Sequence, residues 1–155
     1  MSDFTALTIA GRIATPADPD WDQARAAWNL VADQNPEAVA LVESAEDIAA
    51  TVRFAVQHDL RVAGQGIRHG AAPLGPLDGT HQLPTARMRG IEVDTSSRTA
   101  RLEAGVLSAE LGAAASQHRL SPLPGSSPDV GTVGYTLGGG MSWLARAHGF
   151  ACNHV

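Results

Sequence analysis

The sequence predicts an α+β fold, and three observations carry that prediction. The regular part of this 155-residue chain opens with a strand–helix–strand pattern between residues 39 and 63, which is typical of a parallel sheet. Alternating apolar and polar residues over 91–103 predict a β-hairpin that begins a second sheet. Two glycine-rich segments, 64–70 and 125–140, follow these units. They indicate that the backbone approaches a ligand at two places.

Residues 1–34 are predicted to be a lead-in to a domain that spans 35–155. Pro16 and Pro19 predict a turn in this lead-in. Beyond them, apolar residues recur at roughly helical spacing, which predicts either a short helix packed on the domain or a loosely docked arm. The two tryptophans among them are expected to be packing groups. The spaced residues are Trp21, Ala24, Ala27, Trp28 and Val31.

The strand–helix–strand unit begins with a strand expected at Val39–Val42. A helix follows from a cap at Ser44 to about His58, because a serine before acidic residues favours a helix start. The strand Arg61–Ala63 completes the unit, and a right-handed crossover makes its two strands parallel. The helix face expected to be buried carries Ile48, Val52, Ala55 and Val56.

A glycine-rich loop follows the second strand. Gly64, Gly66 and Gly70 remove side chains where the backbone approaches another group or takes a positive φ. Several N–H groups that point inward in such a loop form an anion-binding nest, and a diphosphate fits it. The loop also lies at the carboxyl edge of its strand, where α/β sheets bind ligands. His69 lies inside this loop.

Two other interpretations of the loop compete with a diphosphate nest. Gly64 and Gly66 begin the pattern of a Rossmann dinucleotide site, but His69 stands at the third glycine and Pro73 prevents a following helix. The other interpretation is an ordinary glycine-rich turn with a surface histidine. Because a second glycine cluster occurs further along the chain, a ligand site is favoured over both.

Between the two glycine segments the sequence predicts a strand, a hairpin and a helix. The strand is expected near Gln82–Leu83. The hairpin pairs 91–94 with 99–103 around a turn at 95–98. Ser108 is expected to cap a helix that runs to about His118.

The second glycine segment contains six glycines within residues 125–140. The spacing of Gly131 and Gly134 leaves one edge of a helix or loop without side chains, so that a flat ligand can reach the backbone. A glycine-rich loop that only turns a corner is the alternative. The triple glycine 138–140 ends any helix there, and the core is expected to receive Trp143, Leu144 and Phe150.

Composition narrows the class of function. A net charge of −5 and the lack of a Lys/Arg cluster argue against a nucleic-acid partner. No apolar run reaches the length of a membrane span, the first residues lack the features of a signal peptide, and no metal-ligand cluster is seen. The single cysteine, Cys152, forms no internal disulfide. A cytoplasmic protein without a membrane partner is therefore expected.

Seven segments between residues 35 and 155 follow one another in an order and spacing that identify a family. They are Arg61-Val-Ala-Gly-Gln-Gly-Ile-Arg-His-Gly70, 85–90, 93–94, 100–105, Pro124-Gly-Ser-Ser-Pro-Asp-Val-Gly131, Gly134-Tyr-Thr-Leu-Gly-Gly-Gly140 and 144–149. Together they resemble the FAD-binding domain of the vanillyl-alcohol oxidase / p-cresol methylhydroxylase (PCMH-type) superfamily. The resemblance is greatest to FAD-linked oxidases of the berberine-bridge and 6-hydroxy-D-nicotine oxidase type. It implies a PCMH-type fold of two α/β subdomains.

The resemblance implies FAD as the cofactor and assigns it to both glycine segments. His69 matches the histidine that, in many members, bonds covalently to the 8α-methyl group of the flavin. A covalent 8α-histidyl FAD is therefore expected, and a non-covalent wall of the site is the alternative. The residues implied to wrap the diphosphate are Gly64, Gln65, Gly66, Ile67, Arg68, His69 and Gly70. Those implied to line the flavin and its ribityl–diphosphate arm are Gly125, Ser126, Val130, Gly131, Gly134 and Tyr135.

Several positions depart from the family pattern or from its catalytic set. Arg68 precedes His69 where the family usually has glycine, and it is expected to pair with phosphate, to obstruct the loop or to face away. Ser127 stands where doubly linked members have a second flavin-bonding cysteine, which implies a single link. No residue here matches the family's catalytic base, so the catalytic residues are unknown. The remaining histidines expected to face solvent or cap helices are His81, His118, His148 and His154.

The resemblance implies an FAD-dependent oxidoreductase of the FAD-linked oxidase type, in which substrate hydride passes to flavin N5 and dioxygen reoxidises the flavin. In the family, the FAD domain continues further and a substrate domain follows, so the chain is expected to be the N-terminal part of such a protein, incomplete at its C-terminus. The alternative is a split or shortened oxidase fragment that at best binds FAD and has no turnover alone. The expected partners are an unknown small-molecule substrate and a complementing chain or a second copy.

Overall fold

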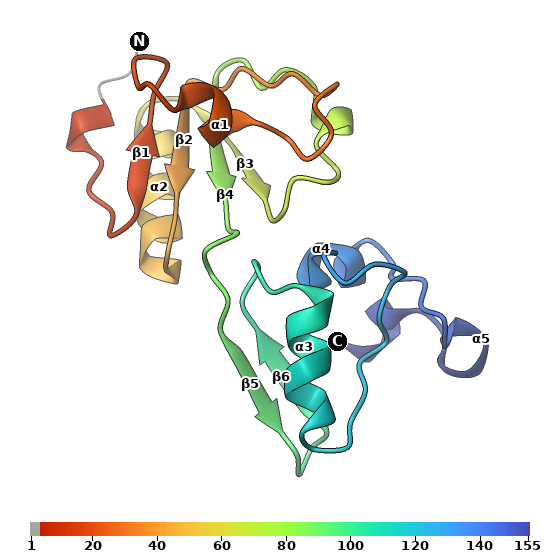
Figure 1. The fold of residues 1–155 in the computed structure, drawn as a ribbon. Helices are drawn as coiled ribbons and strands as arrows, with labels where there is room; N and C mark the ends of the chain where they lie inside the picture. Colours follow the sequence, from red (N-terminus) through yellow and green to blue (C-terminus); the bar gives the residue numbers. More distant parts are fainter. Residues whose placement is uncertain (1–3) are drawn as a thin grey trace. The chain divides into compact units, whose positions relative to one another are not determined.

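The structure is a computed structural model that describes residues 4–155. The chain divides into two compact units, Met1–Arg87 and Met88–Val155 (Figure 1). Within the described residues, no helix combines the length and the apolar character that a bilayer crossing requires.

The first unit is built on a four-stranded sheet with the strand order β1-β2-β4-β3 (Figure 1). Strands β2, β4 and β3 run parallel, and β1 pairs antiparallel with β2 at one edge. The predicted strand–helix–strand unit is present, but β4 lies between its two strands. The strands are β1 (Arg12–Ala14), β2 (Ala38–Leu41), β3 (Arg61–Gln65) and β4 (Thr80–Pro84). The helices are η1 (Phe4–Ala6), α1 (Trp21–Arg25), α2 (Ala45–Gln57) and η2 (Ala72–Leu74).

Helix α2 begins at the predicted cap. The Ser44 hydroxyl accepts a hydrogen bond of 3.1 Å from the backbone N–H of Asp47, which satisfies one of the free donors of the first turn. The Asp47 carboxylate accepts the backbone N–H groups of Ala10, Gly11 and Glu43 at 2.8, 3.0 and 2.9 Å. The start of α2 is therefore also the anchor of the N-terminal segment.

The buried face of α2 differs from the predicted stripe. Val52 and Val56 are exposed, so that part of the prediction is wrong. The reason is that two other side chains make the inward contacts of the helix. Asp47 binds three backbone donors, and the ring of Phe54 packs 5.5 Å, centroid to centroid, from the ring of Phe4. The buried set keeps helical spacing and consists of Asp47, Thr51, Phe54 and Ala55.

The lead-in contributes more to the sheet than its sequence indicated. Strand β1 was not predicted, because its three residues are too short to show an alternating pattern. Ala14 of β1 and Ala24 of α1 pack against Val39 of β2. Helix α1 ends at Arg25, earlier than the apolar spacing suggested. Trp28 lies beyond it and is 62% exposed, so its predicted role as a packing group is wrong.

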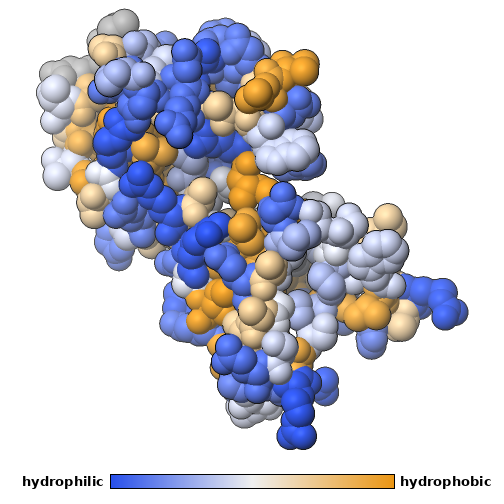
Figure 2. Space-filling model, viewed as in Figure 1, coloured by the Kyte–Doolittle hydropathy of each residue, from blue (hydrophilic) through white to orange (hydrophobic). Residues whose placement is uncertain are grey.

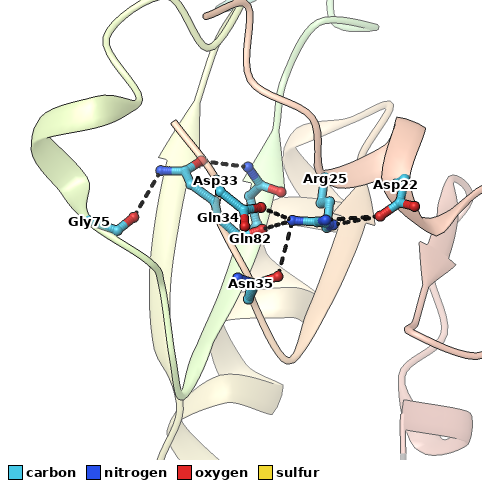
Figure 3. A network of polar contacts seen from close by, with 7 residues as sticks. All are labelled: Asp22, Arg25, Asp33, Gln34, Asn35, Gly75 and Gln82. Carbon is cyan, nitrogen blue, oxygen red and sulfur yellow. Dashed lines mark hydrogen bonds and ion pairs between the residues drawn. The ribbon is translucent and has the colours of Figure 1, made fainter. Parts of the chain in front are cut away.

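Arg25 fixes the segment that leads from α1 into β2. Its guanidinium donates to the carboxylates of Asp22 and Asp33, to the side-chain oxygen of Asn35 and to the backbone carbonyl of Gln34 (Figure 3). The hydrogen bonds that Arg25 donates to Asp33 and Asp22 raise the pKa of Arg25, so the charge persists at any working pH. This arrangement fixes Gln34, whose side chain bonds to the carbonyl of Gly75 and to the amide of Gln82 (Figure 3).

The second unit contains the predicted hairpin. Strands β5 and β6 pair antiparallel around a turn in which the Asp94 carboxylate accepts from Ser96 and Ser97, and these hydrogen bonds lower the pKa of Asp94. The elements are β5 (Ile91–Asp94), β6 (Thr99–Leu102), α3 (Ser108–Ser116), α4 (Thr132–Leu137), α5 (Ala145–His148) and η3 (Ala151–His154). The buried apolar residues are Met88, Val106, Leu111, Ala115 and Ala151.

Two predictions for this unit are wrong. The residue that precedes α3 is Leu107, whose backbone N–H donates 2.8 Å to the Glu110 carboxylate; Ser108 already belongs to the helix. Trp143, Leu144 and Phe150 are exposed rather than buried. The core of the unit instead takes the small Ala151 against Gly140, where a larger side chain has no room. Figure 2 shows hydrophobic side chains at the surface of the molecule.

Candidate functional site

The first glycine loop lies where strand β3 ends. Gly64 and Gln65 belong to the strand, and residues 66–70 form the loop at its carboxyl end. A side-chain carbon built on Gly64 or Gly70 meets nothing within 4 Å, so the space beside both glycines is open. Within the described residues, no backbone N–H of 66–70 donates a hydrogen bond to the protein. These donors are free for an anion.

The positive φ of this loop falls on an arginine. Arg68 has a φ of 61°, a left-handed conformation that costs least for glycine. Its guanidinium donates to the backbone carbonyls of Ala24 and Ala26 at 2.6 and 2.7 Å. Burial lowers the pKa of Arg68. The guanidinium is therefore engaged by carbonyls of the protein.

His69 is exposed on the loop. Its ring lies 4.6 Å, centroid to centroid, from the ring of Trp28, with 53° between the two planes. Neither ring nitrogen bonds to another described residue, so the imidazole is open to an incoming group. Trp28 is a site neighbour that sequence reasoning missed, because its spacing suggested burial.

Gln65 sends its side chain away from the loop, into the protein. It donates 3.0 Å to the side-chain oxygen of Gln34 and accepts 3.1 Å from Gln82. Gln34 also donates 3.0 Å to the carbonyl of Ala71 (Figure 3 shows the neighbouring bonds of Gln34). Only the backbone of Gln65 therefore faces the loop. The signal for this network in the sequence was Gln82, a polar residue inside a predicted strand.

His81 contradicts its expected position at the surface. It is 0% exposed, and its ring lies 5.3 Å from the ring of Phe4 and 6.3 Å from that of Phe54. Both ring nitrogens lack a hydrogen-bond partner, and burial lowers the pKa of His81 to about 4. The physical reason is alternation along β4: Gln82 points to one face, so His81 must point to the face that α2 covers. The other three histidines of that prediction, His118, His148 and His154, are exposed.

The second glycine segment forms helix α4 and the loop before it. Gly131 precedes the helix, and Gly138 ends it, as the triple glycine predicted. Val130 accepts the backbone N–H of Ser108 at 2.9 Å, which fixes the loop to the start of α3. Gly134 is exposed, and a carbon built on it meets nothing within 4 Å. One edge of this helix is therefore free of side chains, in agreement with the predicted spacing.

Tyr135 is held between two glycines of the same segment. A side-chain carbon on Gly125 would lie 3.1 Å from its ring, and one on Gly140 would lie 3.0 Å from it. The Tyr135 hydroxyl is buried without a hydrogen-bond partner, and burial raises the pKa of Tyr135. A buried hydroxyl that lacks a partner is unfavourable unless water or a ligand supplies one.

Each unit by itself offers features that fit part of a large anionic cofactor. In the first unit, the loop at 66–70 offers free N–H donors and Gly64 leaves open space beside the backbone. In the second unit, Gly134 leaves open space beside the backbone and Tyr135 offers an unpaired hydroxyl. None of these groups requires a side-chain cation, which agrees with the acidic composition of the chain.

Comparison with known proteins identifies the family. A family model described as FAD binding domain matches residues 36–155. The chain belongs to this FAD-binding domain family. The match confirms the predicted family and its PCMH-type α/β fold, and it supports FAD as the cofactor.

Relatives of this FAD-binding domain include proteins named as oxidases. (R)-6-hydroxynicotine oxidase of Paenarthrobacter nicotinovorans is 30% identical over 151 residues, which cover 97% of this chain and 33% of that protein. The solved structure of 6-hydroxy-D-nicotine oxidase from Arthrobacter nicotinovorans matches with a TM-score of 0.83 and 31% identity over 97% of this chain and 33% of that one.

A third relative carries its cofactor covalently. The structure of glucooligosaccharide oxidase from Acremonium strictum, which is described for its 6-S-cysteinyl, 8α-N1-histidyl FAD, matches with a TM-score of 0.75. It is 28% identical over 92% of this chain and 30% of that one. The chain thus spans about a third of the length of the relatives that it matches.

Proposed function

We propose that this chain supplies the FAD-binding part of an FAD-linked oxidoreductase of the oxidase type. The observation that carries the proposal is the loop at 66–70, with free N–H donors beside the open imidazole of His69 at the carboxyl end of β3. When bound, FAD accepts hydride from a substrate and passes the electrons to dioxygen. The substrate and the catalytic base are not assigned to residues of this chain.

The diphosphate is held by backbone rather than by side chains in this proposal. The N–H groups of 66–70 donate to its oxygens, and Gly64 and Gly70 keep the approach clear. The guanidinium of Arg68 is already bound to two carbonyls, so it contributes little to the phosphate charge. Affinity then depends on the conformation of the loop, which the buried glutamines beneath it support.

His69 is the proposed point of covalent attachment. One imidazole nitrogen of His69 would hold the cofactor by replacing a hydrogen of its 8α-methyl carbon and would give up its own proton, with dioxygen as the two-electron oxidant that would become hydrogen peroxide. The exposed ring, whose nitrogens make no hydrogen bond to another described residue, supports this role, as does the histidyl FAD of glucooligosaccharide oxidase. The proposed link is single, because Ser127 cannot supply a thiol and its hydroxyl bonds to Asp129.

The second glycine segment is proposed to contact the flavin and its ribityl–diphosphate arm. Gly134 leaves space for a flat ring system, and the Tyr135 hydroxyl is a free partner for a polar group of the cofactor. The remaining proposed contacts of this segment are Gly125, Ser126, Val130 and Gly131.

A second candidate function is FAD binding without turnover by the chain alone. The chain spans a third of the length of its relatives, and large apolar side chains such as Trp143 and Phe150 are exposed. Those surfaces support association with a complementing chain or a second copy. A cytoplasmic location remains part of this proposal and rests on the single cysteine.

The test is the absorbance spectrum of the purified protein before and after acid precipitation. We expect flavin colour that stays with the precipitate in the wild type and washes off in His69→Ala. His118→Ala, another exposed histidine, serves as the control and is expected to behave like the wild type. Colour that washes off in every variant would leave FAD binding and remove the covalent link. A colourless protein that takes up no added FAD would overturn the proposal.

A further inference from the structure

Arg68 holds the end of helix α1 against the glycine loop. A helix leaves its last carbonyls without partners, and the guanidinium of Arg68 donates to those of Ala24 and Ala26 at 2.6 and 2.7 Å. The left-handed conformation of Arg68, with a φ of 61°, is unfavourable for a residue other than glycine. Two hydrogen bonds from a charged donor offset that cost.

This contact sets the position of Trp28. Trp28 follows Ala26 by two residues, so the anchor on Ala26 limits where its ring can lie. The ring lies 4.6 Å from the ring of His69 although 62% of Trp28 is exposed. An exposed tryptophan on a surface segment gains little by ordering unless it has a partner, and here that partner is the imidazole.

We propose that Arg68 and Trp28 form a clamp that fixes the orientation of the His69 imidazole. A histidine on an exposed loop otherwise samples several staggered rotamers. The tilted contact with the indole ring, at 53° between the planes, leaves the nitrogens without a hydrogen-bond partner among the described residues while it removes other orientations. Trp28 is thus a positioning residue and Arg68 its anchor. The contact between the two rings does not depend on the proposed function. The purpose of the orientation does, because that purpose is formation of the bond between His69 and the flavin.

The contact itself is tested by NMR of the histidine rings in the full chain without FAD. We expect the ring protons of His69 to resonate upfield of those of exposed His118, because they lie close to an indole ring. The shift is lost in Trp28→Ala and retained in Trp28→Phe. Trp143→Ala, which removes another exposed tryptophan, is the control and leaves His69 unchanged. Ring signals of His69 that do not move in Trp28→Ala overturn the clamp.

The anchor is tested with a matched pair of glycine variants. Arg68→Gly removes the strain and the two hydrogen bonds, and we expect it to abolish the His69 shift without unfolding the protein. Arg119 also has a left-handed φ, 57°, and is exposed, so Arg119→Gly relieves equal strain without a carbonyl contact. It is expected to leave His69 unchanged. An unchanged shift in Arg68→Gly overturns the role of the anchor.

The purpose of the clamp is tested by the rate at which added FAD becomes acid-stable. We expect Trp28→Ala to slow attachment by about tenfold or more, because small losses of alignment reduce rates strongly, and Trp28→Phe to restore most of it. Equal rates in wild type and Trp28→Ala overturn the positioning role. If the wild type forms no acid-stable flavin, the proposed covalent function fails, and the positioning role fails with it. The contact between the rings of His69 and Trp28 is tested independently of this result by the NMR experiment.

Discussion

The side-chain amide of Gln65 donates a hydrogen bond of 3.0 Å to the side-chain oxygen of Gln34. The amide of Gln34 in turn donates 3.0 Å to the carbonyl of Ala71. Gln65 precedes the loop at 66–70 and Ala71 follows it, so one buried side chain holds both ends of the loop. Gln82 of β4 completes the network with hydrogen bonds to Gln34 and Gln65.

This network predicts that Gln34→Leu destabilises the first unit. The change leaves the amide of Gln65 and the carbonyl of Ala71 without their partner, and a buried polar group left unpaired costs about 1–3 kcal/mol. The free energy of unfolding, measured in urea, is expected to fall by that amount. Gln57→Leu replaces an exposed glutamine of the same unit and is expected to leave the transition in place. Equal midpoints for both variants would show that the network adds no stability.

His81 predicts a loss of stability as the pH falls from about 6.5 to about 4. The unfolded chain binds a proton on this histidine near pH 6.5, whereas the folded protein resists protonation until about pH 4, because the ring is buried without a partner. Each unit by which the pH falls in this window therefore lowers the free energy of unfolding, by a total of about 3 kcal/mol. Stability against urea is measured as a function of pH.

The control for this pH dependence is a pair of leucine variants. His81→Leu removes the titrating ring from its site between Phe4 and Phe54, so the slope between pH 6.5 and 4 is expected to flatten. His118→Leu changes an exposed ring and is expected to keep the slope of the wild type. A slope that persists in His81→Leu would assign the acid sensitivity to other groups.

Local patterns predicted the elements that depend on local physics. The cap at Ser44, the hairpin at 91–102 and the end of α4 at Gly138 each follow from a few neighbouring residues, and the structure confirms them. The glycine spacing predicted the open loop and the free edge at Gly134 for the same reason, because only glycine leaves such space.

The misses depend on contacts between distant segments. His81 and Gln82 are buried because β4 inserts between β2 and β3, and no local pattern reports the order of strands in a sheet. The stripe on α2 was misjudged because Asp47 binds backbone groups 36 and 37 residues away. The spacing of Trp28 predicted a core residue, but its ring contacts that of His69, which lies far along the chain in the loop after β3. Hydrophobic character alone does not say which partner a side chain finds.

Asp47 predicts a second, more acidic dependence of stability. Burial raises its pKa, but the hydrogen bonds from the backbone N–H groups of Glu43, Ala10 and Gly11 outweigh burial and leave the pKa below its usual value of 3.8. Its contribution is therefore present above about pH 4 and is lost as the pH falls through the lower folded value. Asp47→Asn is expected to cost about 2–3 kcal/mol at pH 7, because these are hydrogen bonds to a charged acceptor.

The neighbouring residue offers the control for Asp47. Glu46→Gln removes one negative charge from the same turn of α2, but its side chain is exposed and makes no such contacts. We expect a change of a few tenths of a kcal/mol for this variant, from the helix dipole alone. If Glu46→Gln and Asp47→Asn shift the urea transition equally, helix charge and not the anchor of residues 10 and 11 explains the effect.

Gly134 and Gly140 predict opposite results for the same substitution. Alanine at Gly134 meets nothing within 4 Å and lies inside helix α4, so Gly134→Ala is expected to raise stability, by up to about 1 kcal/mol, while it weakens FAD binding by filling the free edge. Alanine at Gly140 would lie 2.6 Å from the Cβ atom of Ala151 at a φ of +70°, so Gly140→Ala is expected to destabilise the second unit. Thermal unfolding and FAD titration of both variants separate the two roles. Where the glycine makes room for the ligand, its alanine variant has a lower FAD affinity without a lower stability. Where the glycine makes room for packing, its alanine variant has a lower stability first. Unchanged FAD affinity in Gly134→Ala would mean that the open edge of α4 does not face the cofactor.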